Sequence, residues 1–172
     1  MRKMAFILSM WLVSATNVTA SQWSDCIADK YKRYAVAQAA WQTGLNRLIL
    51  EVAPQYADVA QLYMTDQLRA IERARLAVEY LTEHDPTKLR TQLPLPNWLN
   101  LDEADVQRIA NDNRRYAELL RLEKEAMARP PHPDGDDLRR FMRTEINALE
   151  GYRKLLDAFS RSVQDAGSIE CK

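Results

Sequence analysis

Residues 27–52 read IADKYKRYAVAQAAWQTGLNRLILEV, and this stretch decides the fold class. Its large side chains recur at alternating spacings of four and three residues, which is the period of one face of an α helix. The positions on that face are Ile27, Tyr31, Tyr34, Gln38, Trp41, Leu45, Leu48 and Val52. The pattern predicts an amphipathic helix over 22–52 that buries one stripe against its neighbours.

Three further stretches carry the same period and predict three more helices. The second helix is expected over 55–83, and the fourth over 134–167. The third is expected to begin after Asn100 and to continue to Met127. Asn100 followed by Glu103 fits the pattern of a capping box, which predicts the start of that helix.

The composition gives little support to a β-sheet. The chain has only four glycines, and no segment of strand length alternates apolar with polar residues. We therefore expect an all-α fold, arranged as an antiparallel up-down-up-down four-helix bundle with a long loop between helices two and three. Residues 21–172 are long enough to form this bundle as a single domain.

The first twenty residues have the features of a signal peptide. Arg2 and Lys3 precede an apolar run over 4–13, and Ala20 is the small residue that signal peptidase requires before Ser21. The apolar run is shorter than the roughly 20 residues that span a bilayer, so no stable membrane insertion is expected after cleavage. The sequence predicts export to the periplasm as a secreted, processed protein.

Cys26 and Cys171 are the only cysteines, and they lie near the two ends of the predicted mature chain. In an oxidising compartment two such thiols are expected to form a disulfide. An up-down-up-down topology places the start of the first helix and the end of the fourth at the same end of the bundle. The predicted topology and the predicted disulfide therefore agree, although neither was used to derive the other.

The connection over 84–100 is long for a compact domain, and long connections often carry function. Its apolar residues Leu93, Leu95, Trp98 and Leu99 are candidates for a partner-binding surface. The alternative is that the same side chains form a lid over the open end of the core. The sequence leaves both interpretations open.

Charge and motif inventories argue against several classes of function. Lysines and arginines number 24 and aspartates and glutamates also 24, so a basic surface for nucleic acid is not expected. The two histidines, His84 and His132, are predicted to lie at opposite ends of the bundle, which disfavours a catalytic triad. The chain has no Cys-x-x-Cys-His, no Glu-x-x-His and no glycine-rich phosphate loop, so no metal or other cofactor is expected. The acidic turn over 132–137 does not follow calcium-loop spacing.

Five polar residues interrupt the predicted apolar stripes: Gln38, Gln67, Asn113, Glu123 and Glu145. Polar groups at such positions either find partners and set the register of the helices, or face solvent. A buried Glu145 would be a candidate acid. If the chain were an enzyme of an unrecognised kind, the residues to substitute would be Glu145, Tyr34, Tyr116 and Tyr152.

These observations favour a non-enzymatic protein that binds another envelope or secreted protein. An inhibitor, an immunity protein, a chaperone and an envelope-assembly factor all fit that description. The alternative is a carrier that holds a small ligand or a metal in the bundle interior, and an unrecognised enzyme is a third hypothesis. The second predicted helix is apolar along more than one line, so a homodimer is also compatible with the sequence.

The predicted signal peptide can be tested by blocking its processing. Replacing Ala20 with tyrosine should make the precursor accumulate, because the peptidase accepts only a small residue at that position. Intact-mass measurement of the exported wild-type protein should give the mass of residues 21–172. Ala28→Tyr, beyond the cleavage point, is the control and should be processed normally. A wild-type protein that keeps residues 1–20 would contradict the prediction.

Overall fold

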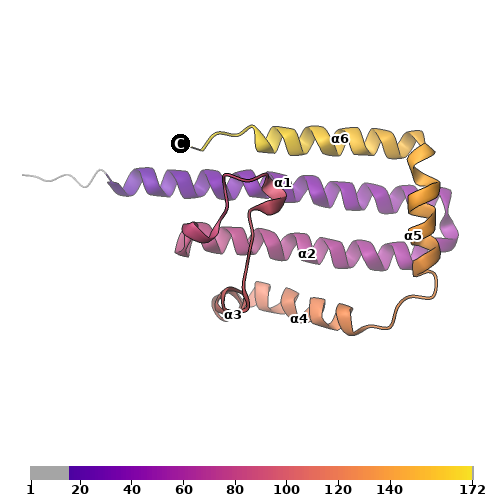
Figure 1. Ribbon diagram of the computed structural model, residues 1–172, viewed down its shortest axis with the longest axis horizontal. Coiled ribbons are helices and arrows are strands. Elements are labelled where there is room, and N and C mark those ends of the chain that lie inside the picture. Colours follow the sequence, from indigo (N-terminus) through magenta and orange to yellow (C-terminus); the bar gives the residue numbers. More distant parts are fainter. Residues whose placement is uncertain (1–15, 172) are drawn as a thin grey trace, which may run out of the picture.

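The computed structural model describes residues 16–171, and over that range it is all-α, with six α helices, four short 3-10 turns and no strand (Figure 1). Helix α1 (Thr16–Val52) begins earlier than expected, and residues 16–20 of the predicted signal peptide are its first residues. The rest of that peptide, residues 1–15, lies outside the described residues. Within the described range, no helix has both the length and the hydropathy to cross a membrane.

Four helices lie side by side in the order α6, α1, α2, α4, and we call them the helix row (Figure 1). Helix α1 packs against both α2 (Ala57–His84) and α6 (Glu150–Gly167), and α4 (Arg114–Ala128) packs on the far side of α2. The all-α prediction is therefore confirmed. The predicted four-helix bundle is not confirmed, because two of the four expected continuous helices are broken into shorter ones.

The third predicted helix is interrupted at Asn113. This residue has an extended backbone, with φ −125° and ψ 100°, and its side chain accepts a hydrogen bond of 2.9 Å from the backbone N–H of Tyr116. Asn113 thus ends α3 (Glu103–Asp112) and caps the start of α4. The break turns α3 out of the plane of the row, so that it is seen end-on in Figure 1, and both Ile109 of α3 and Tyr116 of α4 are buried in the core.

The fourth predicted helix is interrupted between Thr144 and Glu150. A 3-10 turn over Ile146–Ala148 and the extended Leu149 separate α5 (Gly135–Thr144) from α6. Helix α5 crosses the ends of α1 and α2 in Figure 1. This crossing buries Leu138 and Phe141 of α5 together with Ile146.

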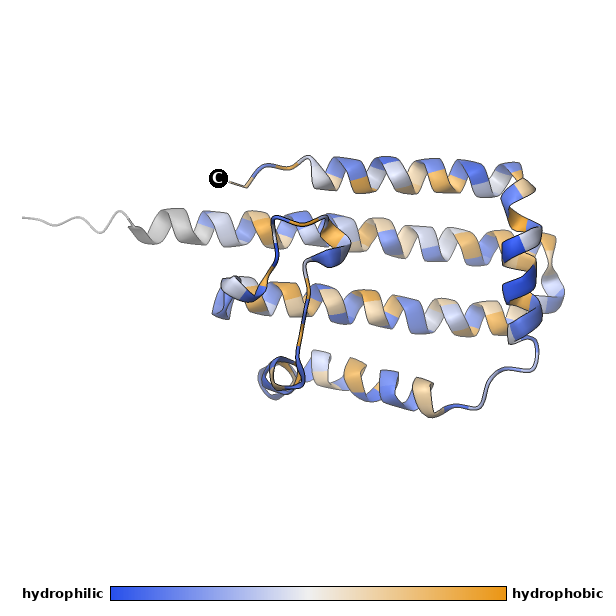
Figure 2. Ribbon diagram, viewed as in Figure 1, coloured by the Kyte–Doolittle hydropathy of each residue, from blue (hydrophilic) through white to orange (hydrophobic). Residues whose placement is uncertain are grey.

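The buried apolar side chains form two separate clusters, and the apolar stripes of the helices face into them (Figure 2). The first cluster lies near the chain ends and includes Ile27, Tyr31, Tyr34, Val78, Leu81, Leu95, Trp98, Ile109 and Tyr116. The second lies under α5 and includes Ile49, Ala53, Val59, Ala60, Leu138, Phe141 and Ile146. Helix α5 and the loop after α2 lie on the same face of α1 and α2, at opposite ends. Between these two clusters, the middle of that face has no covering element.

Two glycines allow α1 and α6 to approach closely. A Cβ on Gly44 would lie 2.5 Å from Cδ1 of Leu155, and a Cβ on Gly151 would lie 3.0 Å from Cδ1 of Leu48. Each glycine therefore receives a leucine from the facing helix, a contact that a larger residue would obstruct. Trp41 of α1 packs beside them against Tyr152 and Phe159, with ring centroids 5.6 and 5.4 Å apart.

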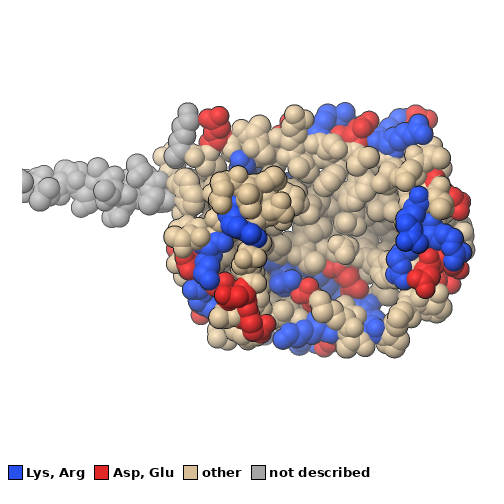
Figure 3. Space-filling model, in the orientation of Figure 1, with Lys and Arg blue, Asp and Glu red and all other residues tan. Residues whose placement is uncertain are grey.

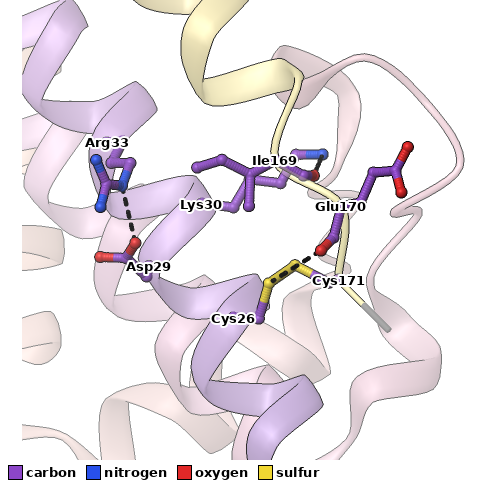
Figure 4. The surroundings of a disulfide bond; sticks show 7 residues. All are labelled: Cys26, Asp29, Lys30, Arg33, Ile169, Glu170 and Cys171. Carbon is purple, nitrogen blue, oxygen red and sulfur yellow. Dashed lines mark hydrogen bonds and ion pairs between the residues drawn. A yellow bond between two sulfur atoms is a disulfide. The ribbon is translucent and has the colours of Figure 1, made fainter.

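Cys26 and Cys171 form the expected disulfide, with their Cα atoms 5.6 Å apart (Figure 4). Beside it the ammonium of Lys30 donates a hydrogen bond of 2.7 Å to the carbonyl of Ile169. The bridge holds the last residues of the chain against α1. Because it links residues 145 positions apart, it stabilises the fold by up to about 5 kcal/mol through the entropy of the unfolded chain.

The close contact of α1 with α6 yields a stability prediction. Gly44→Val should lower the free energy of unfolding by about 1–3 kcal/mol, because the new side chain meets Leu155 in a packed contact. Urea denaturation followed by circular dichroism measures this. The control is Gly167→Ala, where nothing lies within 4 Å, and it should be neutral or stabilising by up to about 1 kcal/mol.

A double variant checks the cause of that loss. Gly44→Val combined with Leu155→Ala should lose less stability than the two single variants added together, because the two positions share one space. If the stability losses of the two single variants simply added in the double variant, the valine would act through a contact other than Leu155.

Candidate functional site

The loop over 85–102, which we call the lid, lies over the first core cluster. Trp98 is 1% exposed and Leu95 is 5% exposed, so both are core residues. The Trp98 ring packs on Tyr31 with centroids 5.8 Å apart, and its indole N–H donates to the carbonyl of Leu93 at 2.8 Å. Of the four predicted partner-binding residues, Leu99 is half-buried against the same cluster and only Leu93, at 38%, is exposed.

Ion pairs hold the lid to α3. The carboxylate of Asp105, 3% exposed, accepts hydrogen bonds from Lys88 at 3.0 Å and from Arg108 at 2.9 Å. The hydrogen bond to Asp105 raises the pKa of the Lys88 ammonium. Arg108 also lies 3.6 Å from Asp85 at the start of the lid. The lid is therefore fixed at its base, as expected for a structural cover.

Three ion pairs join α4 and its C-cap residue Arg129 to α2, and one of them explains a polar interruption. Glu123 pairs with Arg73 at 2.9 Å, Glu72 with Arg115 at 2.9 Å, and Asp66 with Arg129 at 3.1 Å. The hydrogen bond from Arg115 lowers the pKa of the Glu72 carboxyl. Since that pKa lies below its ordinary value, this pair supports the contact at neutral pH and loses its effect as the pH falls through the lowered value.

The other polar interruptions are explained in different ways. Glu145 and Gln67 are exposed and Gln38 is half-buried, so Glu145 is not the buried acid that the enzyme hypothesis would need. Glu145 is the C-cap of α5, and the break after α5 turns it to solvent. Asn113 is the N-cap of α4.

The tyrosines of the enzyme hypothesis are packing residues in three different contacts. Tyr34 packs edge-to-face on Tyr31, and burial raises the pKa of Tyr31 to about 12, with the charge of Tyr34 adding to the effect. The Tyr116 hydroxyl accepts a hydrogen bond of 3.2 Å from Arg73, and Tyr152 packs on Trp41. The structure does not bring them together around a substrate-sized space.

The two histidines also make local contacts and do not form part of a shared site. His84 ends α2 and stacks on Tyr80, with ring centroids 4.2 Å apart. His132, in the connection after α4, accepts a hydrogen bond from the backbone N–H of Asp134. In the range that the structure describes, no three His, Cys, Asp or Glu side chains come together as metal ligands.

A concave face with no charged side chains in its middle lies between the lid and α5, over α1 and α2 (Figure 3). Gln42 of α1 and Met64 of α2 lie on this side of the row, because both line a pocket beside α5. Gln38 and Gln67 lie about one helical turn further along the same faces. Three glutamines thus lie on the uncovered side of α1 and α2, and the two at stripe positions, Gln38 and Gln67, are the sequence features that could have indicated an open surface.

The pocket on the concave face has a volume of about 110 Å³, and we call it the α5 pocket. Its lining residues come from α1, α2 and α5: Gln42, Leu45, Asn46, Ile49, Ala60, Tyr63, Met64, Leu138 and Met142. Typical small-molecule sites measure about 300–1,000 Å³, so this pocket is suited to a single side chain.

Asn46 gives the α5 pocket an unusual polar group. Its side chain is 7% exposed, and its Nδ2 donates to Oε1 of Gln61 at 3.1 Å. Its Oδ1 is buried and accepts no hydrogen bond from any described residue. A buried carbonyl without a donor costs about 1–3 kcal/mol, so a donor that reached it would be bound favourably. Sequence reasoning missed this residue, since Asn46 lies off the main stripe and follows no motif.

Comparisons of this chain with known protein families, curated proteins and solved structures found no match.

The assignment of the lid to the core can be tested with two lid residues. Trp98→Ala should lower the free energy of unfolding by about 3–5 kcal/mol, because it removes a fully buried aromatic side chain. Leu93→Ala should change it by less than about 1 kcal/mol, because that side chain is exposed at the surface. Urea denaturation followed by circular dichroism at 222 nm suits both variants. Equal losses would show that the lid does not contribute to the core in this way.

Proposed function

We propose that this chain is an exported, periplasmic protein that acts by binding another protein through the concave face between the lid and α5. The observation that carries the proposal is that Asn46, whose buried Oδ1 has no hydrogen-bond partner among the described residues, lines a pocket the size of one side chain. Protein interfaces concentrate their binding energy where an anchor side chain fills such a pocket away from water.

The chemistry of the pocket limits the partner. Its walls are apolar apart from amides and one phenol, and none of its lining residues is charged. A charged anchor would lose its hydration there without a counter-ion, which is unfavourable. We therefore expect an anchor with an apolar body and a neutral N–H or O–H donor, such as glutamine or asparagine, on a largely uncharged segment of an envelope or secreted protein.

The lid contributes to the proposal through its rigidity. With Trp98 and Leu95 in the core, the lid forms one fixed wall of the concave face, and α5 forms the other. Fixed walls reduce the ordering cost of association. This use of the lid differs from direct binding by Leu93, Leu95, Trp98 and Leu99, since only Leu93 among them is well exposed.

Affinity capture with matched variants tests the location of the binding surface. Gln42→Arg should abolish retention of the partner from a periplasmic extract, because the new side chain brings a charge into the α5 pocket. Thr43→Arg is the control: it makes the same kind of change at the next residue of α1, which is exposed and does not line the pocket. It should retain the partner, and the retained protein should then form a defined complex when purified.

Two outcomes would overturn the proposal. Equal retention by wild type, Gln42→Arg and Thr43→Arg would show that the concave face is not used. If Leu93→Glu lost the partner while Gln42→Arg retained it, binding would be placed on the lid instead.

Asn46→Leu separates binding from stability. Removing the unpartnered carbonyl should leave the free energy of unfolding unchanged or raise it, because a buried unsatisfied acceptor is replaced by apolar surface of similar size. The affinity for the captured partner should fall about tenfold or more, since one hydrogen bond in a dry pocket is lost. Calorimetric titration gives the affinity, and unchanged affinity would exclude Asn46 as the recognition group.

A further inference from the structure

A second groove lies between α1 and α6, near the disulfide, with a volume of about 650 Å³. Small side chains lie along its floor: Ala37 and Ala40 of α1 and Ala166 of α6. Val36 stands at its edge with 62% of its surface exposed, which is high for an apolar residue in the middle of a long helix. Val36 and Gln38, two positions apart, point to opposite sides of α1, so this groove lies on the side away from the concave face.

The two walls of the groove carry opposite charges. Lys32 projects from the α1 wall and Asp165 from the α6 wall, and neither has an ion-pair partner among the described residues. The other two charged residues, Asp29 and Arg33, already pair with each other at 2.8 Å (Figure 4). One unpaired cation and one unpaired anion therefore flank an apolar floor.

The register between the helices places these two charges at the same level. Gly44 lies opposite Leu155, Leu48 lies opposite Gly151, and the disulfide joins Cys26 to Cys171. The two helices are antiparallel and both rise about 1.5 Å per residue, so each step forward in α1 corresponds to one step back in α6. Lys32 is therefore level with about residue 166, next to Asp165.

We propose that a second copy of this chain docks on this groove, related to the first by a two-fold axis parallel to α1 and α6. Such an axis lays α1 of each copy over α6 of the other. It brings Lys32 of each copy against the partner's Asp165, so both unpaired charges are matched twice. Val36 then packs against the small side chains of the partner's α6. A two-fold interface must be complementary to itself, and a groove with opposite charges at one level on its two walls meets that condition.

Sedimentation equilibrium of the purified, disulfide-bonded protein tests the dimer. The wild type should form a dimer with increasing concentration. Val36→Glu should raise the dissociation constant about tenfold or more, because it places a charged carboxylate where the dimer would bury apolar surface and lets that carboxylate compete for Lys32 one turn away. The control is Leu156→Glu, an equally simple change at an exposed leucine of α6 that does not line the groove, and it should leave the dimer intact.

A charge exchange tests the predicted pairing itself. Lys32→Glu and Asp165→Lys should each weaken the dimer, since each places like charges together, and the double variant Lys32→Glu, Asp165→Lys should restore it. A chain that stays monomeric at all concentrations, or a double variant as weak as the single ones, would overturn the proposal. If the wild type is monomeric and binds a different protein, and Val36→Glu loses that protein, the groove belongs to another partner. That result would also overturn the proposal.

This inference is independent of the proposed function. Gln42→Arg, on the concave face, should remain dimeric, and Val36→Glu should keep the captured partner, so failure of one proposal is distinguishable from failure of the other.

Discussion

The burial of α1 between α2 and α6 is the constraint on which the rest of the structure depends. Gly44 and Gly151 let α6 approach on one side, α2 packs on the other, and the disulfide fixes the end of α6 against α1. Because α1 is covered on two opposite flanks, its remaining two sides must be covered by other elements or stay open. The lid and α5 cover the two ends of one side, and they leave the concave face between them.

The division of the core into two clusters follows from that arrangement. Each cover brings large apolar side chains of its own, Trp98 and Leu95 from the lid, and Leu138 and Phe141 from α5. Between the covers, α1 and α2 present amides where the apolar stripes would otherwise continue. Gln38 and Gln42 are half-buried there and Gln67 is exposed, whereas Asn46 is buried and lacks a donor for its Oδ1. A group that costs stability in the isolated chain is a natural place to look for a binding partner.

Several elements of the fold were predictable from local patterns, and the interruptions were not. The stripes on α1 and α2 and the cysteine positions predicted long helices and a disulfide, both of which the structure confirms. Asn113 was recognised as a polar interruption, but its role as a cap depends on α3 turning out of the plane of the row. The break after Thr144 has no local sign, because the helical period continues through it. It arises because Leu138 and Phe141 bury their surface against the ends of α1 and α2.

The sequence by itself determined the all-α class, the presence of the long helices α1 and α2 and the pairing of Cys26 with Cys171, because the helical period is a local property and the chain has only two cysteines. Only the tertiary structure decided which residues remain available to a partner. It placed Trp98 and Leu95 in the core, turned Glu145 to solvent, and brought Asn46 beside α5. The reason is physical: exposure depends on which element packs over a helix, and that choice is made by contacts between residues far apart in the chain.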